Sequence, residues 1–269
     1  GNGLLIGHVL GLVAGCLIYL KDIPKSLGVI SYAQLQAVAK KYSSFPKLSM
    51  PASLVNILAT SMPVFLLSAF DSQEATGYFG NAYKLTYLPL SMLGMALSQV
   101  FFERIARLKS KSEEVQSLSH QLLNFAFALI LLPGLAMLIW GDKITPFLLG
   151  DQWEEAGIYA QIIIVFFIAM FITSIFSVAF ETYQKLKVQL VYNTLFLAFT
   201  TGAMVLAFTL GYHTRTALLW FAIVGTIMRL GILNYFFVLF GKPIYGKTLL
   251  GLAIFAVIGI IGLYFRGIL

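Results

Sequence analysis

Charged residues are scarce in this sequence: Asp, Glu, Lys and Arg make up 11% of its 269 residues, whereas hydrophobic residues make up 59%. A soluble domain has roughly 25% charged residues, because its surface must face water. The composition therefore excludes a soluble enzyme, a nucleic-acid-binding domain and a disordered chain. The net charge of +7 is not a nucleic-acid signal, since surplus Lys and Arg in membrane proteins usually mark cytoplasmic loops.

Groups that carry chemistry are also nearly absent. Cys16 is the single cysteine, so no intramolecular disulfide and no cysteine-based metal site can form. The sequence contains no glycine-rich phosphate loop, no pair of carboxylates within its apolar runs and no cluster of His, Asp and Glu at ligand spacing. We therefore expect no enzyme activity, no cofactor and no bound metal.

Long apolar runs predict an all-α polytopic membrane protein. The runs are continuous, and they have the roughly 20 residues that a helix needs to cross the hydrocarbon core rather than the alternating segments of about ten residues of a transmembrane β-barrel. We predict eight spans: Gly3–Leu20, Ser49–Phe70, Tyr78–Phe102, Gln121–Trp140, Ile158–Phe180, Leu190–Leu210, Thr216–Phe240 and Thr248–Phe265. Only two charged residues, Lys84 and Arg229, fall inside them.

The distribution of Lys and Arg predicts the orientation. Thirteen of the 18 Lys and Arg residues lie in the alternate connectors 21–48, 103–120, 181–189 and 241–247, and three lie outside the spans on the other side. The first set should therefore face the cytoplasm. The first span then runs inward, so an odd number of spans is expected before Gly1 if the N-terminus is cytoplasmic. The sequence is interpreted as part of a longer protein.

Two connectors have features of their own. Residues 27–42 place their apolar side chains roughly on one helical face and end in two lysines, which favours an amphipathic helix on the inner membrane surface; a solvated linker is the alternative. The outer connector 141–157 is half apolar. We expect it to dip into the membrane interface, with Trp153 at headgroup level.

The second span has a narrow polar face. Its members repeat at helical spacing and are Ser49, Ser53, Asn56, Thr60 and Pro63. Small residues of this kind allow close helix packing, which is the simpler interpretation for the hydroxyls. For Asn56, packing and a role in the wall of a hydrated cavity are both open.

The third span has a richer polar face, opposite a face of leucines. Its members lie within about a third of the helix circumference and are Asn81, Lys84, Tyr87, Ser91, Ser98 and Gln99. This pattern is typical of a helix between lipid and an aqueous cavity. Lys84 lies about 9 Å from the outer edge of its span at 1.5 Å per residue, so a side chain that snorkels to the headgroups is the alternative.

Arg229 lies near the middle of its span, where a charge costs several kcal/mol and usually faces a cavity or a partner. Ala222, Gly225 and Thr226 lie on the same side, so this face should meet protein. No Asp or Glu falls inside a predicted span. The guanidinium should therefore be paired with a missing part of the protein, with an anionic ligand or with backbone carbonyls.

A series of short motifs resembles a known family. Residues 45–58 (FPKLSMPASLVNIL) are followed by Gly77-Tyr78-Phe79, Tyr83-Lys84-Leu85, Pro89, Gly94 and Gln99-Val100-Phe101-Phe102, and then by residues 148–160, which contain Gly150, Trp153, Ala156 and Gly157. In their order and spacing, these elements resemble the second half of an oligosaccharide flippase of the multidrug/oligosaccharidyl-lipid/polysaccharide exporter superfamily. Beyond residue 190 the likeness is in the span pattern alone.

The resemblance implies a domain organisation. Residues 1–20 would be the last helix of a first lobe, 21–48 a cytoplasmic connector with the amphipathic helix, 49–240 a second six-helix lobe and 241–269 an extra C-terminal transmembrane helix. The two lobes would enclose a central cavity. The protein would be a multi-pass protein of the inner (plasma) membrane, of bacterial or archaeal type.

The resemblance also implies an activity: translocation of a polyprenyl-diphosphate-linked oligosaccharide from the inner to the outer leaflet for surface polysaccharide synthesis, such as that of lipopolysaccharide. Lys84 and Arg229 would attract the diphosphate, and the glycan path would be lined by Asn56, Asn81, Tyr87, Ser91 and Gln99. The expected partners are this lipid-linked oligosaccharide, membrane lipids, a coupling ion (H⁺ or Na⁺) and the polysaccharide polymerase machinery, with no nucleic acid. The alternatives are a peptidoglycan-precursor flippase, a drug exporter of the same superfamily, a membrane-embedded glycan-assembly enzyme and a structural subunit.

Overall fold

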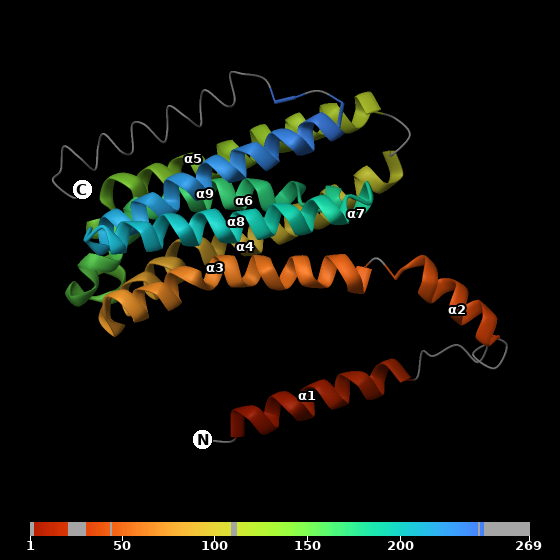
Figure 1. Cartoon of the computed structure of the whole chain (residues 1–269), viewed down its shortest axis with the longest axis horizontal. Coiled ribbons are helices and arrows are strands. Elements are labelled where there is room, and N and C mark those ends of the chain that lie inside the picture. Colours follow the sequence, from red (N-terminus) through yellow and green to blue (C-terminus); the bar gives the residue numbers. More distant parts are fainter. Residues whose placement is uncertain (1–2, 21–30, 44, 109–111, 242, 245–269) are drawn as a thin grey trace. The chain divides into compact units, whose positions relative to one another are not determined.

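The computed structural model describes residues 3–20, 31–43, 45–108, 112–241 and 243–244. All the regular elements in these residues are helical, and no strand occurs among them (Figure 1). The helices are α1 (Gly3–Leu20), α2 (Tyr32–Lys41), a π-helical turn (Phe45–Ser49), α3 (Met50–Phe70), α4 (Gln73–Leu108), α5 (Ser112–Leu149), a 3₁₀ turn (Asp151–Trp153), α6 (Glu154–Phe176), α7 (Ala179–Thr182), α8 (Leu186–Thr209) and α9 (Thr214–Leu239). The predicted all-α fold class is confirmed.

Six helical segments of the described chain are long and apolar enough to cross a membrane, by length and composition. They are Tyr32–Phe70, which contains α3, and Gln73–Leu108, Glu113–Leu149, Asp151–Thr182, Leu186–Thr209 and Thr214–Leu239. Within α1, Ile6–Leu17 is a shorter apolar helix. The predicted span Thr248–Phe265 lies outside the described residues. The chain is therefore a multi-pass membrane protein.

The chain divides into two compact units, Gly1–Lys47 and Leu48–Leu269. In the first unit, α2 lies within the predicted helix 27–42. Its start is fixed by a capping box, in which the Ser31 hydroxyl accepts from the backbone N–H of Gln34 and the Gln34 side-chain oxygen accepts from the backbone N–H of Ser31. This reciprocal pair satisfies two backbone donors at the helix end. Two lysines, Lys40 and Lys41, lie in the last turn.

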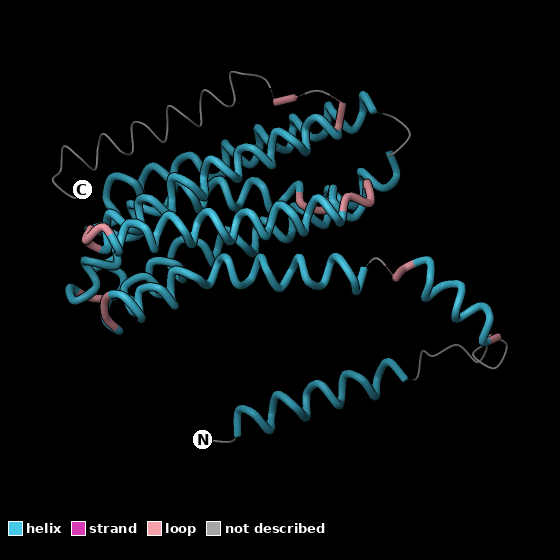
Figure 2. The backbone as a smooth tube through the Cα atoms, viewed as in Figure 1, coloured by secondary structure: helices cyan, strands magenta, loops and turns pink. Residues whose placement is uncertain are grey.

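The second unit is a helix bundle built around α6. Helix α6 packs on α4, α5 and α9, while α3 packs on α8 and α4, and α8 packs on α9. Figure 2 shows these long helices running side by side. Nearly every residue of α6 from Ala156 to Phe176 is buried, because this helix is apolar around its whole circumference and such a helix belongs in the interior.

The connectors differ from the expectation. Helix α4 continues to Leu108 and α5 begins at Ser112, so most of the predicted connector 103–120 is helical. The segment 141–157, predicted as an outer connector, is likewise mostly helical, since α5 continues to Leu149 after a kink at Trp140 (φ −123°, ψ 18°) and α6 begins at Glu154. Hydropathy marks only the part of a helix inside hydrocarbon, whereas backbone hydrogen bonding continues into the interface. The depth of Trp153 in the membrane stays a prediction.

The segment Gly150–Gly157 has a structural reason for each of its motif residues. Gly150 has φ +103°, a conformation that favours glycine, and it ends α5. Trp153 packs edge-on against Tyr78 of α4, with ring centroids 5.9 Å apart. Ala156 is fully buried, and Gly157 lies so close to α5 that a Cβ atom there would be 2.2 Å from the Gly141 carbonyl oxygen. The motif therefore fixes the turn and the contact between α5 and α6.

Candidate functional site

A polar cavity of about 230 Å³ lies inside the second unit. We call it the recess. Five long helices and α7 supply its lining, which comprises Ser53, Asn56, Ile57, Tyr87, Met170, Thr173, Ser174, Ser177, Phe180, Gln189, Tyr192, Asn193, Arg229, Ile232 and Phe236. Arg229 is the charged residue among them. The recess therefore combines one cation with amides, hydroxyls and aromatic rings.

Arg229 is held in the recess by two neutral groups. Its Nη2 donates to Oδ1 of Asn56 at 3.4 Å, and its guanidinium carbon lies 4.4 Å from the centre of the Phe196 ring. The residue is 8% exposed, and its Nε has no hydrogen-bond partner among the described residues. No carboxylate of the described chain forms an ion pair with it. Within the described chain, the recess is therefore a buried site whose positive charge has no acidic partner.

The rest of the lining shows which polar groups are already used. The hydroxyls of Thr173, Ser174 and Ser177 donate to carbonyl oxygens of their own helix, so they present oxygen lone pairs to the recess. Asn193 donates from Nδ2 to the Ala52 carbonyl oxygen at 2.8 Å, which fastens α8 to α3. Gln189 Oε1 and the Tyr192 hydroxyl are buried without a partner in the described chain.

The structure brings three of the seven predicted site residues together. Asn56, Tyr87 and Arg229, from α3, α4 and α9, all line the recess. The other four, Asn81, Lys84, Ser91 and Gln99, lie on α4 and are not part of this lining. Lys84 and Gln99 are exposed, and Asn81 and Ser91 are half-buried. The roles of all seven stay predictions.

Sequence reasoning missed the contribution of α8. Gln189, Tyr192 and Asn193 line the recess, and Phe196 supports the guanidinium from the next turn. These four residues repeat at helical spacing on one face, so the sequence does contain the signal. The span is predicted to begin at Leu190 from the length of its apolar run and from its lack of charged residues. Neither criterion detects uncharged amides on an apolar helix.

A second cavity, of about 290 Å³, lies between α4, α5 and α6. Its lining is apolar apart from the Thr86 hydroxyl and includes Pro89, Pro133 and Phe171. The Thr86 hydroxyl donates to the carbonyl oxygen of Ala82 in its own helix. This cavity presents no charge and no free side-chain donor, so the recess is the better candidate for recognition of a polar ligand.

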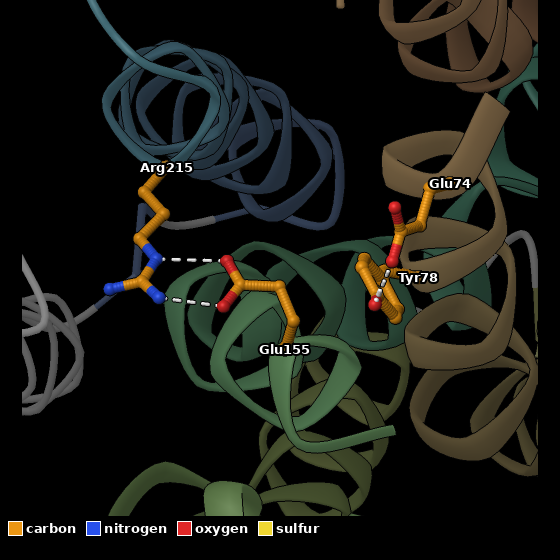
Figure 3. A network of polar contacts seen from close by, with 4 residues as sticks. All are labelled: Glu74, Tyr78, Glu155 and Arg215. Carbon is orange, nitrogen blue, oxygen red and sulfur yellow. Dashed lines mark hydrogen bonds and ion pairs between the residues drawn. The ribbon is translucent and has the colours of Figure 1, made fainter. Parts of the chain in front are cut away.

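Polar contacts also join the other ends of the helices (Figure 3). Arg215 at the start of α9 donates from Nε and Nη2 to the two carboxylate oxygens of Glu155 on α6, at 2.9 and 2.6 Å. The Tyr78 hydroxyl donates to Glu74 Oε1 at 2.5 Å, and the Thr214 hydroxyl donates to Asp71. The Arg215 and Thr214 contacts link the start of α9 to α6 and to the residue after α3, whereas the Tyr78 contact lies within α4. All of them lie at the end of the bundle that the charge distribution predicts to be outside.

The bidentate pair should make a measurable but small contribution to stability. The Arg215 and Glu155 side chains are 36% and 27% exposed, so solvent screens their attraction. A double-mutant cycle with Glu155→Gln and Arg215→Gln should give a coupling free energy of about 0.5–1 kcal/mol, which should fall as salt is raised. Denaturant unfolding of the purified protein in detergent would measure it, and a coupling of zero at low salt would contradict this assignment.

Helices of membrane-spanning length packed around a buried cation define a polytopic membrane protein with an internal polar site. A family model described as polysaccharide biosynthesis protein matches residues 3–158. The chain belongs to this family, which confirms the resemblance to flippase-type exporters at the level of the family and gives the protein a role in polysaccharide synthesis or export. Neither the curated proteins nor the solved structures contain a significant match to the chain.

Proposed function

We propose that this protein translocates a polyprenyl-diphosphate-linked oligosaccharide from the inner to the outer leaflet of the cytoplasmic membrane of a bacterial or archaeal cell, for synthesis of a surface polysaccharide. The observation that carries the proposal is Arg229, a buried cation that faces a polar recess and has no described acidic partner. A diphosphate inside a membrane needs such a group, because charged donors hold phosphate oxygens strongly and water is scarce.

The sign of the charge distinguishes this function from export of cationic drugs. A cationic substrate would be recognised by acidic groups in the transport path, whereas the recess contains Arg229 and no carboxylate. A peptidoglycan-precursor flippase has the same diphosphate requirement, so the two flippase functions differ only in the glycan that each carries. The work done is movement between leaflets, without covalent chemistry.

The two intramembrane cations are assigned different positions on the path. Lys84 is exposed on α4, where it would attract the headgroup, and Arg229 would bind it within the recess. Asn56 and Tyr87 belong to the recess, while Asn81, Ser91 and Gln99 would line the glycan path along α4. Rocking of the two lobes about the site would alternate its access between the leaflets. An H⁺ or Na⁺ gradient would drive this movement. The polymerase machinery would then use the translocated oligosaccharide.

This function predicts a specific lipid phenotype. Deletion of the gene for the full-length protein should make complete lipid-linked repeat units accumulate on the inner leaflet. Strains complemented with Arg229→Ala or Lys84→Ala should show transport at least about tenfold slower than strains complemented with the wild type. The reason is that each hydrogen bond to a charged group contributes roughly 1.5–3 kcal/mol. The measurement is the fraction of lipid-linked oligosaccharide accessible to a membrane-impermeant probe in sealed vesicles.

Other results would select other functions. Truncated glycans in the deletion strain would indicate an enzyme of glycan assembly, and unchanged glycans would indicate a small-molecule exporter or a structural subunit. Full transport by both alanine variants at wild-type protein levels would refute the assignment of the cations. Lys143→Ala, an exposed lysine on α5 away from the recess, is the matched control and should complement fully.

A further inference from the structure

We propose that the recess is a binding subsite for a single phosphate-sized oxyanion, which enters from the cytoplasmic end of the bundle and is held by Arg229 together with the polar side chains of α3 and α8, while any glycan stays outside. The binding chemistry itself does not depend on transport. The identity of the natural source, a lipid-linked diphosphate, rests on the proposed function.

The charge of the recess is the first argument. A buried guanidinium without an anion is unfavourable in a membrane interior, and the described residues supply only a neutral amide and an aromatic face. Both contacts leave the charge uncompensated. The Nε–H is buried and unpaired, so an oxyanion beside it would satisfy this donor and the charge together.

The side chains that α3 and α8 contribute to the recess include further hydrogen-bonding groups. Because Asn56 accepts from the guanidinium through Oδ1, its amide N–H groups are directed elsewhere. The Tyr192 hydroxyl and Gln189 Oε1 are buried and unpaired, on the same helix one turn apart. A half-turn of the Gln189 side-chain amide exchanges the positions of its oxygen and its nitrogen, which have nearly the same shape. Gln189 can therefore offer its N–H groups instead of its oxygen. Arg229, Asn56, Tyr192 and Gln189 all line the recess, so a ligand within it has one cation and three neutral polar side chains available.

The size of the recess limits the ligand. Sites for drug-sized ligands have volumes of about 300–1,000 Å³, and the recess has about 230 Å³. One oxyanion and a few water molecules fit this space, but an oligosaccharide does not. The sugars of a lipid-linked substrate would therefore lie outside the recess while its phosphate occupies it.

The exposure of the lining gives the direction of entry. Ser53, near the start of α3, and Ser177, at the end of α6, are exposed, whereas Tyr87, Asn193 and Arg229 are buried. The connectors that precede α3 and follow α6 both belong to the lysine-rich set that is predicted to be cytoplasmic. The opening is thus at the cytoplasmic end, and Arg229 lies deeper in the membrane.

The test uses a cysteine at the opening. In the full-length protein with Cys16 and any other native cysteine replaced by serine, Ser177→Cys provides a thiol that a maleimide can alkylate. Inorganic phosphate should slow alkylation with a saturable concentration dependence, and chloride at equal ionic strength should not. Ser117→Cys, an exposed position on α5 outside the recess lining, is the control and should show no protection.

Two added substitutions identify the binding group. Arg229→Gln should lower the apparent phosphate affinity at least about tenfold, as expected for loss of a charged hydrogen-bond donor. Asn56→Asp should do the same while leaving a folded protein, because the new carboxylate pairs with the guanidinium in place of the ligand. Lys187→Gln, an exposed lysine at the start of α8, should retain protection, since surface charge is not the proposed cause.

The ligand series separates the site from the function. Protection by phosphate and by a short-chain isoprenyl diphosphate, both sensitive to Asn56→Asp, supports the subsite with the lipid as its source. Protection by phosphate alone supports the subsite and contradicts the lipid source, and with it the role of Arg229 in the proposed function. Protection by neither, or protection that persists in both Arg229→Gln and Asn56→Asp, overturns the subsite even if the leaflet assay shows a flippase.

Discussion

Replacing Asn56 with aspartate is expected to abolish translocation while the protein remains folded in the membrane. Asn56 Oδ1 already accepts from Arg229 Nη2 at 3.4 Å, so a carboxylate at this position has a cation within reach and forms a charge-assisted pair. The pair neutralises the charge of the recess, and the new carboxylate repels an anionic headgroup. Loss of the charged interaction alone should lower transport about 10- to 150-fold, for a contribution of 1.5–3 kcal/mol.

The control for this substitution is the same chemical change at a different position. Asn124 is exposed on α5 and does not line the recess, so Asn124→Asp should transport at the wild-type rate. Both variants should show wild-type yield and elution in detergent chromatography. Transport by Asn56→Asp at a rate near wild type would show that Arg229 does not need its free charge, and a low yield for Asn56→Asp but not Arg229→Ala would contradict the expected pairing.

The central contact of the site could be predicted in part from the sequence. Asn56 lies on a polar face of its span, and a charge at the middle of a span must meet a cavity or a partner, so both residues are candidates from the pattern alone. Their hydrogen bond joins α3 to α9 across a long stretch of chain. Helical periodicity gives the direction of each side chain relative to its own helix, but not which helix lies opposite, and the pairing therefore required the structure.

The same limit explains Lys84. On α4, Lys84 and Tyr87 are within one turn of each other, and periodicity groups them on one polar face. In the bundle, Tyr87 turns into the recess beside α6, whereas Lys84 remains exposed. A face that spans a third of a helix is wider than the contact between two helices. Residues at its two edges therefore reach different environments.

The segment Gly150–Gly157, which contributed to the family resemblance, could be recognised in the sequence, but the sequence does not show why its residues are needed. Its glycines form a positive-φ residue at Gly150 and a helix contact at Gly157, and neither reason is visible without the partner helix. The Gly157 contact is to the backbone of Gly141 and Asp142, near the kink at Trp140. Beside it, Gln161 Nε2 donates to Asp142 Oδ1 and to the Ile139 carbonyl oxygen, which adds side-chain contacts between α6 and α5 at this point.

Gly157→Val is accordingly expected to destabilise the second unit more than the substitutions in the recess or at the Arg215–Glu155 pair. Even an alanine Cβ would lie 2.2 Å from the Gly141 carbonyl oxygen and 2.8 Å from its carbon, and backbone atoms cannot move aside as a side chain can. Overpacking of a core costs about 1–3 kcal/mol when side chains can adjust, so a backbone clash should reach at least the upper end. Thermal unfolding in detergent would measure the loss.

For comparison, a Cβ atom added at Gly202 on α8 would meet no atom of another helix within 4 Å, so Gly202→Ala should be neutral or stabilise by up to about 1 kcal/mol through helix propensity. Equal melting temperatures for Gly157→Val and Gly202→Ala would show that α5 and α6 do not meet through these glycines, and the motif would then need a reason outside the packing of the bundle.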